Sequence, residues 1–169
     1  PGVIGDLCAG QGTKPRQLRA RFPQATIIAT DTDRSRYAVL RSAFESDERV
    51  RVLPPRHASE ELRGQADLVL LDVPCSNTGV LGRRVEARYR CTRAALDRLT
   101  GIQKQLIADT MPLLSPRGSI VYATCSIEPS ENDDVAEWAR SWHGLAAERT
   151  RRPLPAAPQP RPSRFAVRP

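Results

Sequence analysis

The sequence predicts an α/β fold, a doubly wound and mostly parallel sheet with helices between its strands. Short apolar runs alternate with amphipathic stretches along the chain, a pattern typical of alternating strands and helices. A turn containing two glycines follows the first apolar run, as expected where a strand leads into a helix beside a ligand. The run "ADLVLLD" at 66–72 is apolar enough for a central parallel strand.

Six elements are expected before residue 73. Residues 35–45 place apolar side chains at 37, 40 and 44, on one side of a helix. Pro15 is accepted in the first turn of its helix, because the N–H that it lacks has no partner there. The expected elements are a strand at 2–9, a helix at 14–22, a strand at 25–30, a helix at 35–45 and strands at 49–53 and 66–72.

A long connection at 73–91 precedes the second group of elements. Thr92 can cap a helix that runs to about residue 114, which Pro112 bends or ends early. A strand at 118–126 and a helix opened by Pro129 follow, with acidic residues at the positive end of that helix. Six prolines after residue 152 predict a weakly structured segment, although 144–150 and 164–168 are candidates for a final antiparallel hairpin.

Composition limits the class of protein. The 169 residues suffice for one domain with a core, and no apolar run approaches the roughly 18 residues of a membrane helix. The net charge of +7 and the pI near 9.9 favour a polyanionic partner, although the excess of arginine over lysine is explained equally well by a high-GC genome. Four cysteines without a CxxC pair predict reduced thiols in the cytoplasm and no metal site.

The segment "DLCAGQGTK" at 6–14 is the first candidate binding site. Gly10 and Gly12 let the backbone approach a ligand, and Asp31 lies 19 residues beyond Gly12, where it can accept hydrogen bonds from ribose hydroxyls. A ligand-free tight turn explains the glycines almost as well, and Asp31 or Asp33 can equally cap the next helix. The combination favours an adenosine cofactor, either S-adenosylmethionine or a dinucleotide.

Two cysteines follow strands that should end at the same edge of the sheet. Cys75 lies in "DVPCSNTGV" after Asp72, and Cys125 lies in "ATCS". Two thiols beside an aspartate suit covalent catalysis, in which one thiolate adds to an electrophilic carbon and the second assists elimination. Each cysteine can instead be a small buried apolar residue, which is the interpretation we prefer for Cys8 and Cys91.

These segments resemble the Sun/Fmu family of S-adenosylmethionine-dependent RNA cytosine-C5 methyltransferases. The three segments are similar to its motifs DLCAAPGGK, DAPCSGTG and VYSTCSLEPEEN, and "GVLGRRVEARYR" fits the basic stretch after the first cysteine. The resemblance covers residues 3–142. It implies the Rossmann-like sheet of class I methyltransferases, S-adenosylmethionine as cofactor, RNA as substrate, and a catalytic domain at 1–152 followed by a Pro-rich segment at 153–169 or by the last strand of the same domain.

The resemblance also implies catalytic roles. Cys125 would attack C6 of a flipped-out cytosine, Cys75 would support loss of the C5 proton and elimination of Cys125, and Asp72 would hold the base edge. On chemistry alone, Cys75 would be the preferred nucleophile. Arg83, Arg84, Arg88 and Arg90 are the implied RNA contacts, with Tyr89 available for stacking, although a solvated charged face explains the same residues.

The implied cofactor contacts come from both glycines and their neighbours. The methionine part would be held by Lys14 and the backbone from Cys8 to Gly12, and the ribose by Asp31. The cofactor-binding residues are therefore Cys8, Ala9, Gly10, Gln11, Gly12, Thr13, Lys14, Asp31 and Asp72.

Three departures from the family pattern bear on activity. Gln11 and Thr13 replace proline and glycine, which predicts a less permissive loop. Arg56 and His57 stand where an acidic residue near the adenine amine is expected, so Ser59 or backbone groups would have to hold the adenine. The family's N-terminal RNA-binding portion is not in this chain, which begins at Pro1 and has Met111 as its one methionine, so we expect an excised or processed segment.

Three functions are consistent with these features. The first is methylation of cytosine C5 in RNA, ribosomal RNA before transfer RNA, with a separate domain or chain supplying RNA recognition. The second is a non-catalytic module that keeps the fold and binds RNA or the cofactor. The third is methylation of DNA, which is less favoured because DNA enzymes usually carry the nucleophile after the fourth strand, at the place of Cys75.

Overall fold

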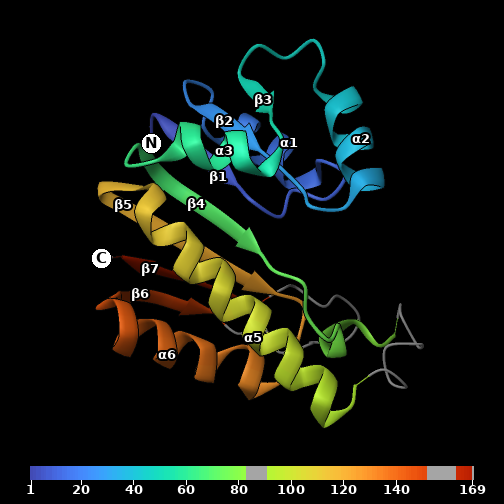
Figure 1. Ribbon diagram of the computed structural model, residues 1–169, viewed down its shortest axis with the longest axis vertical. Coiled ribbons are helices and arrows are strands. Elements are labelled where there is room, and N and C mark those ends of the chain that lie inside the picture. Colours follow the sequence, from blue (N-terminus) through green and yellow to red (C-terminus); the bar gives the residue numbers. More distant parts are fainter. Residues whose placement is uncertain (83–90, 152–162, 169) are drawn as a thin grey trace. The chain divides into compact units, whose positions relative to one another are not determined.

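The computed structural model describes residues 1–82, 91–151 and 163–168. Its seven strands are hydrogen-bonded in the order β3-β2-β1-β4-β5-β7-β6 (Figure 1). The chain forms two compact units. The N-terminal unit comprises Pro1–Asp72 and Thr110–Ile120, and the C-terminal unit comprises Val73–Asp109 and Val121–Pro169. The predicted α/β fold with a mostly parallel, doubly wound sheet is confirmed.

The N-terminal unit alternates strands and helices. Strand β1 pairs in parallel with β2 on one side and β4 on the other, and β2 pairs in parallel with β3. Helix α1 contacts β2, and helix α3 contacts β1 and β2. The bounds are β1 (Val3–Asp6), α1 (Thr13–Arg21), β2 (Thr26–Ala29), α2 (Arg34–Ala43), β3 (Val50–Val52), α3 (Pro55–Leu62) and β4 (Ala66–Asp72).

Apolar side chains of these elements form one core cluster. Ile4 of β1, Ile27 of β2 and Leu40 of α2 have no exposed surface. Phe44, just beyond α2, and Val50 of β3 complete the packing around them. Connections between parallel strands are right-handed, so the path from β1 through β2 to β3 and back to β4 places α3 on the opposite face from α1 and α2.

Helix α3 is absent from the sequence-based expectation. No element was predicted between the strands at 49–53 and 66–72, although Pro55 suits the first helical position, where a missing N–H costs nothing. Only Ala58 and Leu62, four residues apart, are buried along this eight-residue helix. Two apolar positions are too few for a recognisable helical period, which explains the omission.

The remaining elements begin with η1 (Thr78–Val80), a single 3₁₀ turn. Thr92 caps α5 as predicted, accepting a hydrogen bond from the Ala95 N–H at 3.2 Å, and the helix ends before Pro112. The strand expected at 118–126 begins four residues earlier, at Leu114. The bounds are α5 (Arg93–Thr110), η2 (Met111–Leu113), β5 (Leu114–Thr124), η3 (Pro129–Glu131), α6 (Asp133–His143), β6 (Ala146–Arg151) and β7 (Ser163–Arg168).

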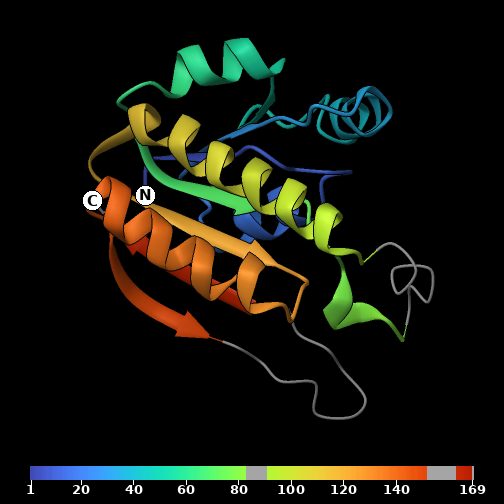
Figure 2. The same cartoon turned by 60° about the horizontal axis from the view of Figure 1, so that its bottom comes forward.

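The C-terminal unit contains the predicted antiparallel hairpin. Strands β6 and β7 pair antiparallel, with a register irregularity between Ala147 and Arg149. Helices α5 and α6 lie side by side in both ribbon views (Figures 1 and 2), and the Lys104 ammonium of α5 lies 5.7 Å from the ring centre of Trp138 on α6. In the part of the chain that the structure describes, no helix is long and apolar enough to cross a membrane.

Gly118 provides a test of the packing around β5. A Cβ atom at this position would lie 2.5 Å from the carbonyl oxygen of Ala66 on β4, too close for any real contact. We expect Gly118→Ala to lower the free energy of unfolding by roughly 2 kcal/mol, because backbone atoms must move apart. Urea titrations followed by far-ultraviolet circular dichroism measure the change.

The matched control is Gly101→Ala in α5, where the added methyl group meets nothing within 4 Å. Alanine is the better helix former by about 0.5–1 kcal/mol, so this variant should be slightly more stable than the wild type. A Gly118→Ala protein as stable as the wild type would contradict the close approach of β4 and β5.

Candidate functional site

The segment between β1 and α1 turns sharply at its two glycines. Gly10 has φ +58° and Gly12 has φ +97°, conformations that L side chains rarely adopt. The turn is closed by backbone hydrogen bonds from the Ala9 N–H to the Thr30 carbonyl and from the Gly12 N–H to the Ala9 carbonyl, each 3.0 Å long. The glycines therefore shape a turn that ends at the N-terminus of α1.

Gly12 is required for packing as well as for conformation. A Cβ atom there would lie 2.7 Å from a ring carbon of Phe44. The sequence-based expectation that Gln11 and Thr13 make the turn less permissive is not supported, because both side chains are exposed and neither residue has positive φ. Both positions that need positive φ in this turn are glycines, so the turn keeps its geometry despite the two departures.

Asp31 connects the end of β2 to this turn. One carboxylate oxygen accepts a hydrogen bond from the Gly10 N–H at 2.9 Å, and the other accepts one from the Asp33 N–H at 2.8 Å. The cap of α2 is Asp33, which accepts from the Arg36 N–H. Asp31 is therefore not that helix cap, and each of its oxygens retains a lone pair for a further donor.

Asp6, at the end of β1, is a buried carboxyl that the sequence analysis did not select. One oxygen accepts a hydrogen bond from the Cys8 N–H at 3.3 Å, and the other is buried without a hydrogen-bond partner in the structure. Burial raises the pKa of Asp6 to about 7, although the Cys8 N–H and the nearby Lys14 oppose this rise. An unpartnered buried oxygen beside the glycine turn suits a cationic donor of a ligand.

Cys8 itself has the character of a structural thiol. Burial, together with the carboxylates of Asp6 and Asp31, raises the pKa of the Cys8 thiol to about 12. A thiol that stays protonated near neutral pH is a poor nucleophile. This agrees with the preference for a structural role at this position.

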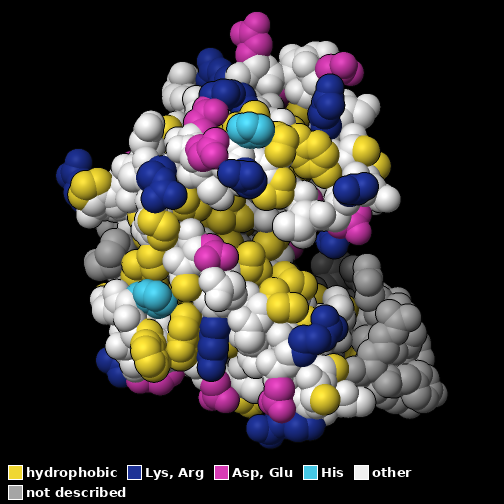
Figure 3. Space-filling model, viewed as in Figure 1, with side chains coloured by type: hydrophobic (Ala, Val, Ile, Leu, Met, Phe, Trp, Pro, Cys, Tyr) yellow, Lys and Arg dark blue, Asp and Glu magenta, His cyan; other side chains and the backbone are white. Residues whose placement is uncertain are grey.

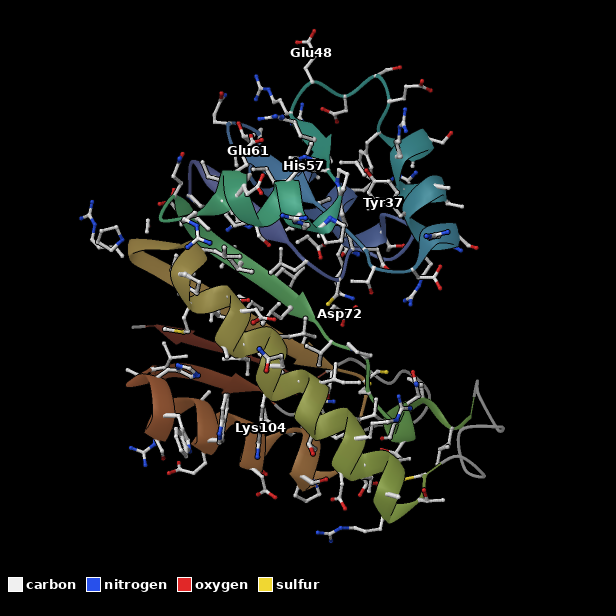
Figure 4. The ribbon with its side chains drawn as sticks, in the orientation of Figure 1. Tyr37, Glu48, His57, Glu61, Asp72 and Lys104 are labelled. Atoms are coloured by element: carbon white, nitrogen blue, oxygen red, sulfur yellow. The ribbon has the colours of Figure 1, made fainter. Side chains whose placement is uncertain are left out.

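Lys14 and Asp72 form an ion pair in the N-terminal unit. The Lys14 ammonium, at the start of α1, donates to an oxygen of Asp72. Asp72 is the last residue of β4 (Figure 4). Both side chains are partly exposed, with 24% and 31% of their surface accessible. The pair therefore joins two predicted site residues, and its charged groups remain accessible to a ligand.

In the C-terminal unit the structure brings together the two cysteines that the sequence selects. The sulfur of Cys75, after β4, lies 3.1 Å from the sulfur of Cys125, after β5. The Cys125 N–H donates to the Cys75 sulfur at 3.3 Å. The hydrogen bond to Cys125, followed by burial, raises the pKa of the Cys75 thiol far above its ordinary value.

Asn77 is a second contact of Cys125 that sequence reasoning missed. Its amide oxygen lies 3.0 Å from the Cys125 sulfur, and its amide nitrogen donates to the Cys75 carbonyl at 2.9 Å. Among the described residues it is the one non-glycine with positive φ, at 62°. The signal in the sequence was the asparagine of "DVPCSNTG", which stands where the quoted family motif has glycine.

Glu131 of η3 holds the Cys75 segment. Its fully buried carboxylate accepts hydrogen bonds from the Ser76 N–H at 3.0 Å, from the Ser76 hydroxyl at 2.5 Å and from the Gln103 amide at 2.9 Å. The Ser76 and Ser126 hydroxyls lie 3.0 Å apart, so the residues that follow the two cysteines are also joined. This network fixes the backbone on the C-terminal side of each cysteine.

Several predicted residues lie elsewhere. Arg56 and His57 are exposed on the first turn of α3. His57 is labelled on this helix in Figure 4. Cys91 is partly buried just before α5, and burial raises the pKa of its thiol. The predicted RNA contacts Arg83, Arg84, Arg88 and Arg90, with Tyr89, lie outside the described residues. On the face in Figure 3, the Lys and Arg side chains that are described are spread over the surface and not gathered in one patch.

Residues 2–151 match the model of a family described as "16S rRNA methyltransferase RsmB/F", which spans both the glycine turn and the cysteine pair. The chain belongs to this family. The resemblance predicted from the motifs is thereby confirmed, and S-adenosylmethionine is the cofactor of this methyltransferase family.

Two curated relatives carry the name ribosomal RNA small subunit methyltransferase B. The protein from Cronobacter sakazakii is 31% identical over 142 residues, and that from Vibrio cholerae is 34% identical over 134 residues. These alignments cover 78% and 77% of this chain but 32% and 31% of the relatives. The chain therefore spans about a third of the length of the curated relatives that it matches.

A solved structure supports the fold. The crystal structure of NSun6 from Pyrococcus horikoshii with SFG matches 98% of this chain and 47% of its own, with a TM-score of 0.78 and 20% sequence identity. At this identity the likeness concerns the fold, which is that of Rossmann-like class I methyltransferases.

Asp6 gives the N-terminal unit a measurable pH dependence. Its pKa is raised in the folded state, so the folded state binds the proton more tightly than the unfolded chain does. Its stabilising contribution is therefore complete below about pH 4 and is lost as the pH rises toward 7. We expect the stability difference between wild type and Asp6→Asn to change by about 1 kcal/mol per pH unit across this window, in favour of the variant at higher pH.

Urea titrations of both proteins at pH 5 and pH 8, followed by circular dichroism, measure this difference. Asp33→Asn is the matched control, because it removes an exposed carboxylate and asparagine caps a helix as well as aspartate does. A difference between wild type and Asp6→Asn that is the same at both pH values would show that Asp6 is not a buried acid of this kind.

Proposed function

We propose that the chain is the catalytic portion of an RNA methyltransferase that modifies C5 of cytosine through a covalent adduct between Cys125 and C6. The observation that carries this proposal is the sulfur pair of Cys75 and Cys125, 3.1 Å apart, on the segments after β4 and β5. One sulfur can add to the ring while its neighbour stays close enough to act later in the reaction. Membership in the family supports the proposal at the coarser level of ribosomal RNA methylation.

The two thiols take different roles in this mechanism. Cys125, as thiolate, forms a bond to C6, and the electron pair of the C5–C6 double bond makes C5 nucleophilic. After C5 is methylated, a solvent water takes the C5 proton, the electron pair of that C–H bond re-forms the C5–C6 double bond, and Cys125 leaves as thiolate, to which the Cys75 thiol can donate its proton. The assignment of the attack to Cys125 follows the family resemblance, and the pKa of the Cys75 thiol, raised by its hydrogen bond to Cys125 and by burial, is consistent with it.

Asp72 and Lys14 supply polar groups for the base. As Cys125 adds, negative charge spreads over the ring toward O2 and N3. In the proposal, Asp72 hydrogen-bonds the base edge, as the resemblance implies, and Lys14 keeps its carboxylate in place through their ion pair. The partial exposure of both side chains is consistent with this role.

The glycine turn is the proposed cofactor site. S-Adenosylmethionine, when bound, supplies the methyl group. The backbone from Cys8 to Gly12 and the side chain of Lys14 hold its methionine part, while Asp31 accepts from the ribose hydroxyls. The unpartnered oxygen of Asp6 fits this group, since it can accept a hydrogen bond from the ammonium of the methionine part. No single residue is assigned to the adenine, for which Ser59 or backbone groups are candidates.

The RNA substrate and its recognition are further parts of this proposal. Ribosomal RNA is the first candidate because both curated relatives are named as small subunit rRNA methyltransferases, and transfer RNA is the second. The net charge of +7 suits a phosphate-rich partner. The arginines at 83–90, a separate RNA-recognition domain or chain, a cytoplasmic location and the domain limits of 1–152 and 153–169 remain parts of this proposal.

A non-catalytic module that binds RNA or cofactor is the alternative function. Both cysteines, their contact and Asp72 are retained, which favours catalysis. Incubation of the chain with labelled S-adenosylmethionine and total RNA distinguishes the enzyme from the non-catalytic module. Incorporation of label, mapped as 5-methylcytosine, supports the enzyme, whereas cofactor binding by calorimetry without incorporation supports the module.

Substitution of the cysteines tests the division of roles. We expect Cys125→Ala to abolish methylation, because no adduct forms, and Cys75→Ala to accumulate a covalent protein–RNA adduct, because elimination fails. Denaturing gels detect the adduct, and Cys91→Ala is the control that leaves both outcomes as in the wild type. Loss of all adduct in Cys75→Ala, with adduct retained in Cys125→Ala, would reverse the assignment.

Asp31 and Asp33 form a matched pair for the cofactor site. We expect Asp31→Asn to weaken binding of S-adenosylmethionine roughly tenfold or more, because the ribose loses a charged acceptor. Asp33→Asn should bind as the wild type does, since its carboxylate caps α2 and asparagine replaces it there. Isothermal calorimetry gives both dissociation constants, and equal values would remove Asp31 from the site.

A further inference from the structure

The hydrogen bond between Cys125 and Asn77 has a fixed direction. The Asn77 amide nitrogen donates to the Cys75 carbonyl oxygen at 2.9 Å. The amide oxygen of Asn77 could not take this place, because an oxygen without a proton cannot donate a hydrogen bond to another oxygen. The amide oxygen therefore faces the Cys125 sulfur at 3.0 Å. Because an amide oxygen only accepts hydrogen bonds, the proton of this contact belongs to Cys125.

The sulfur contact completes a directional chain. With its own proton directed at Asn77, Cys125 can only accept in the contact with Cys75, whose thiol then donates over 3.1 Å. The order is Cys75 to Cys125 to Asn77. This arrangement satisfies the neutral form of Cys125, whereas a Cys125 thiolate would face the lone pairs of the amide oxygen.

The backbone of Asn77 shows that the side chain is held and not merely nearby. Asn77 has φ 62° and ψ 21°, in the left-handed region that asparagine tolerates and glycine adopts freely. The hydrogen bond to Cys75 two residues earlier ties the short side chain to this turn. The amide therefore has little freedom to rotate away from Cys125.

We propose that Asn77 is a positioning residue that accepts a hydrogen bond from the Cys125 thiol and holds Cys125 as a neutral, oriented thiol until this hydrogen bond is broken. The inference rests on the proposed function, in which Cys125 is the nucleophile, and adds a control over when that nucleophile forms. Attack on C6 then requires that Cys125 lose its proton to a solvent water and that the sulfur turn from the amide oxygen.

Among the described residues, three other titratable side chains take part in the hydrogen-bond network around the two cysteines. They are the Cys75 thiol, the Tyr122 hydroxyl of β5, which donates to the Glu131 carbonyl, and the Glu131 carboxylate of η3, which Ser76 binds. None of them contacts the Asn77 amide in the hydrogen bonds that the structure describes. Substitution of Asn77 therefore changes the environment of Cys125 and leaves the bonds of these groups in place.

Alkylation of Cys125 by iodoacetamide tests the proposal, with peptide-resolved mass spectrometry and a series of pH values. Asn77→Gly removes the acceptor, and its backbone fits φ 62°, so the variant should fold. We expect its alkylation midpoint at Cys125 to fall by about half a pH unit or more, with about a threefold or greater rise in rate below that midpoint.

Asn77→Asp should shift the alkylation midpoint at Cys125 in the opposite direction. Aspartate also tolerates this backbone conformation, and its negative charge opposes a thiolate on Cys125. The alkylation midpoint at Cys125 should therefore rise above that of the wild type, while the rate at Cys91 stays constant in all three proteins. A purely structural asparagine predicts no change in the Cys125 midpoint when circular dichroism shows intact folding, and that result would overturn the proposal.

The alkylation assay needs neither RNA nor cofactor, so its failure is separate from failure of the proposed function. If the wild type methylates no RNA but Asn77→Gly shows the lowered midpoint, the positioning role stands and the enzymatic assignment falls. If the wild type is active and the midpoint is unchanged, the enzymatic assignment stands and the role of Asn77 falls.

Discussion

Glu131 has no exposed surface, and its carboxylate accepts hydrogen bonds from the backbone and hydroxyl of Ser76 and from the Gln103 amide. A buried charge is tolerated only where such donors replace water. Cys75 precedes Ser76 and Asn77 follows it, so one carboxylate fixes the backbone on which the contacts of Cys125 with Cys75 and Asn77 depend. Gln103 also donates to the Pro74 carbonyl, which extends the same restraint to the residue before Cys75.

The fold was predictable where the pattern of side chains is local. The run at 66–72 is observed as β4 with identical limits, because a central parallel strand has an unmistakable apolar composition. Helix α3 was missed because two prolines and only two buried positions give it no periodic signal. Strand β5 was placed too late because "SPRG", at 115–118, resembles a turn, whereas the backbone there is already extended.

Some residues of the candidate site were predictable from the sequence, and others were not. Motifs located Cys75 and Cys125, since residue type and position suffice for thiols. Asp6 and Glu131 stand inside segments that match the quoted motifs but were not selected, because the unsatisfied oxygen of Asp6 arises only from burial and the importance of Glu131 depends on a partner 55 residues away in the sequence. Conversely, the altered residues Gln11 and Thr13 cause less disturbance than the motif suggests, because Gly10 and Gly12 carry the unusual conformations.

Helix α6 carries both tryptophans of the chain, Trp138 and Trp142. Trp142 is 76% exposed, whereas Trp138 lies against Lys104 and His143. Both indoles belong to the C-terminal unit, so intrinsic fluorescence reports the environment of the cysteine-bearing half of the protein. Melting of the glycine turn and its strands can proceed without a change in that emission, and the difference between fluorescence and circular dichroism curves would reveal whether the two units unfold together.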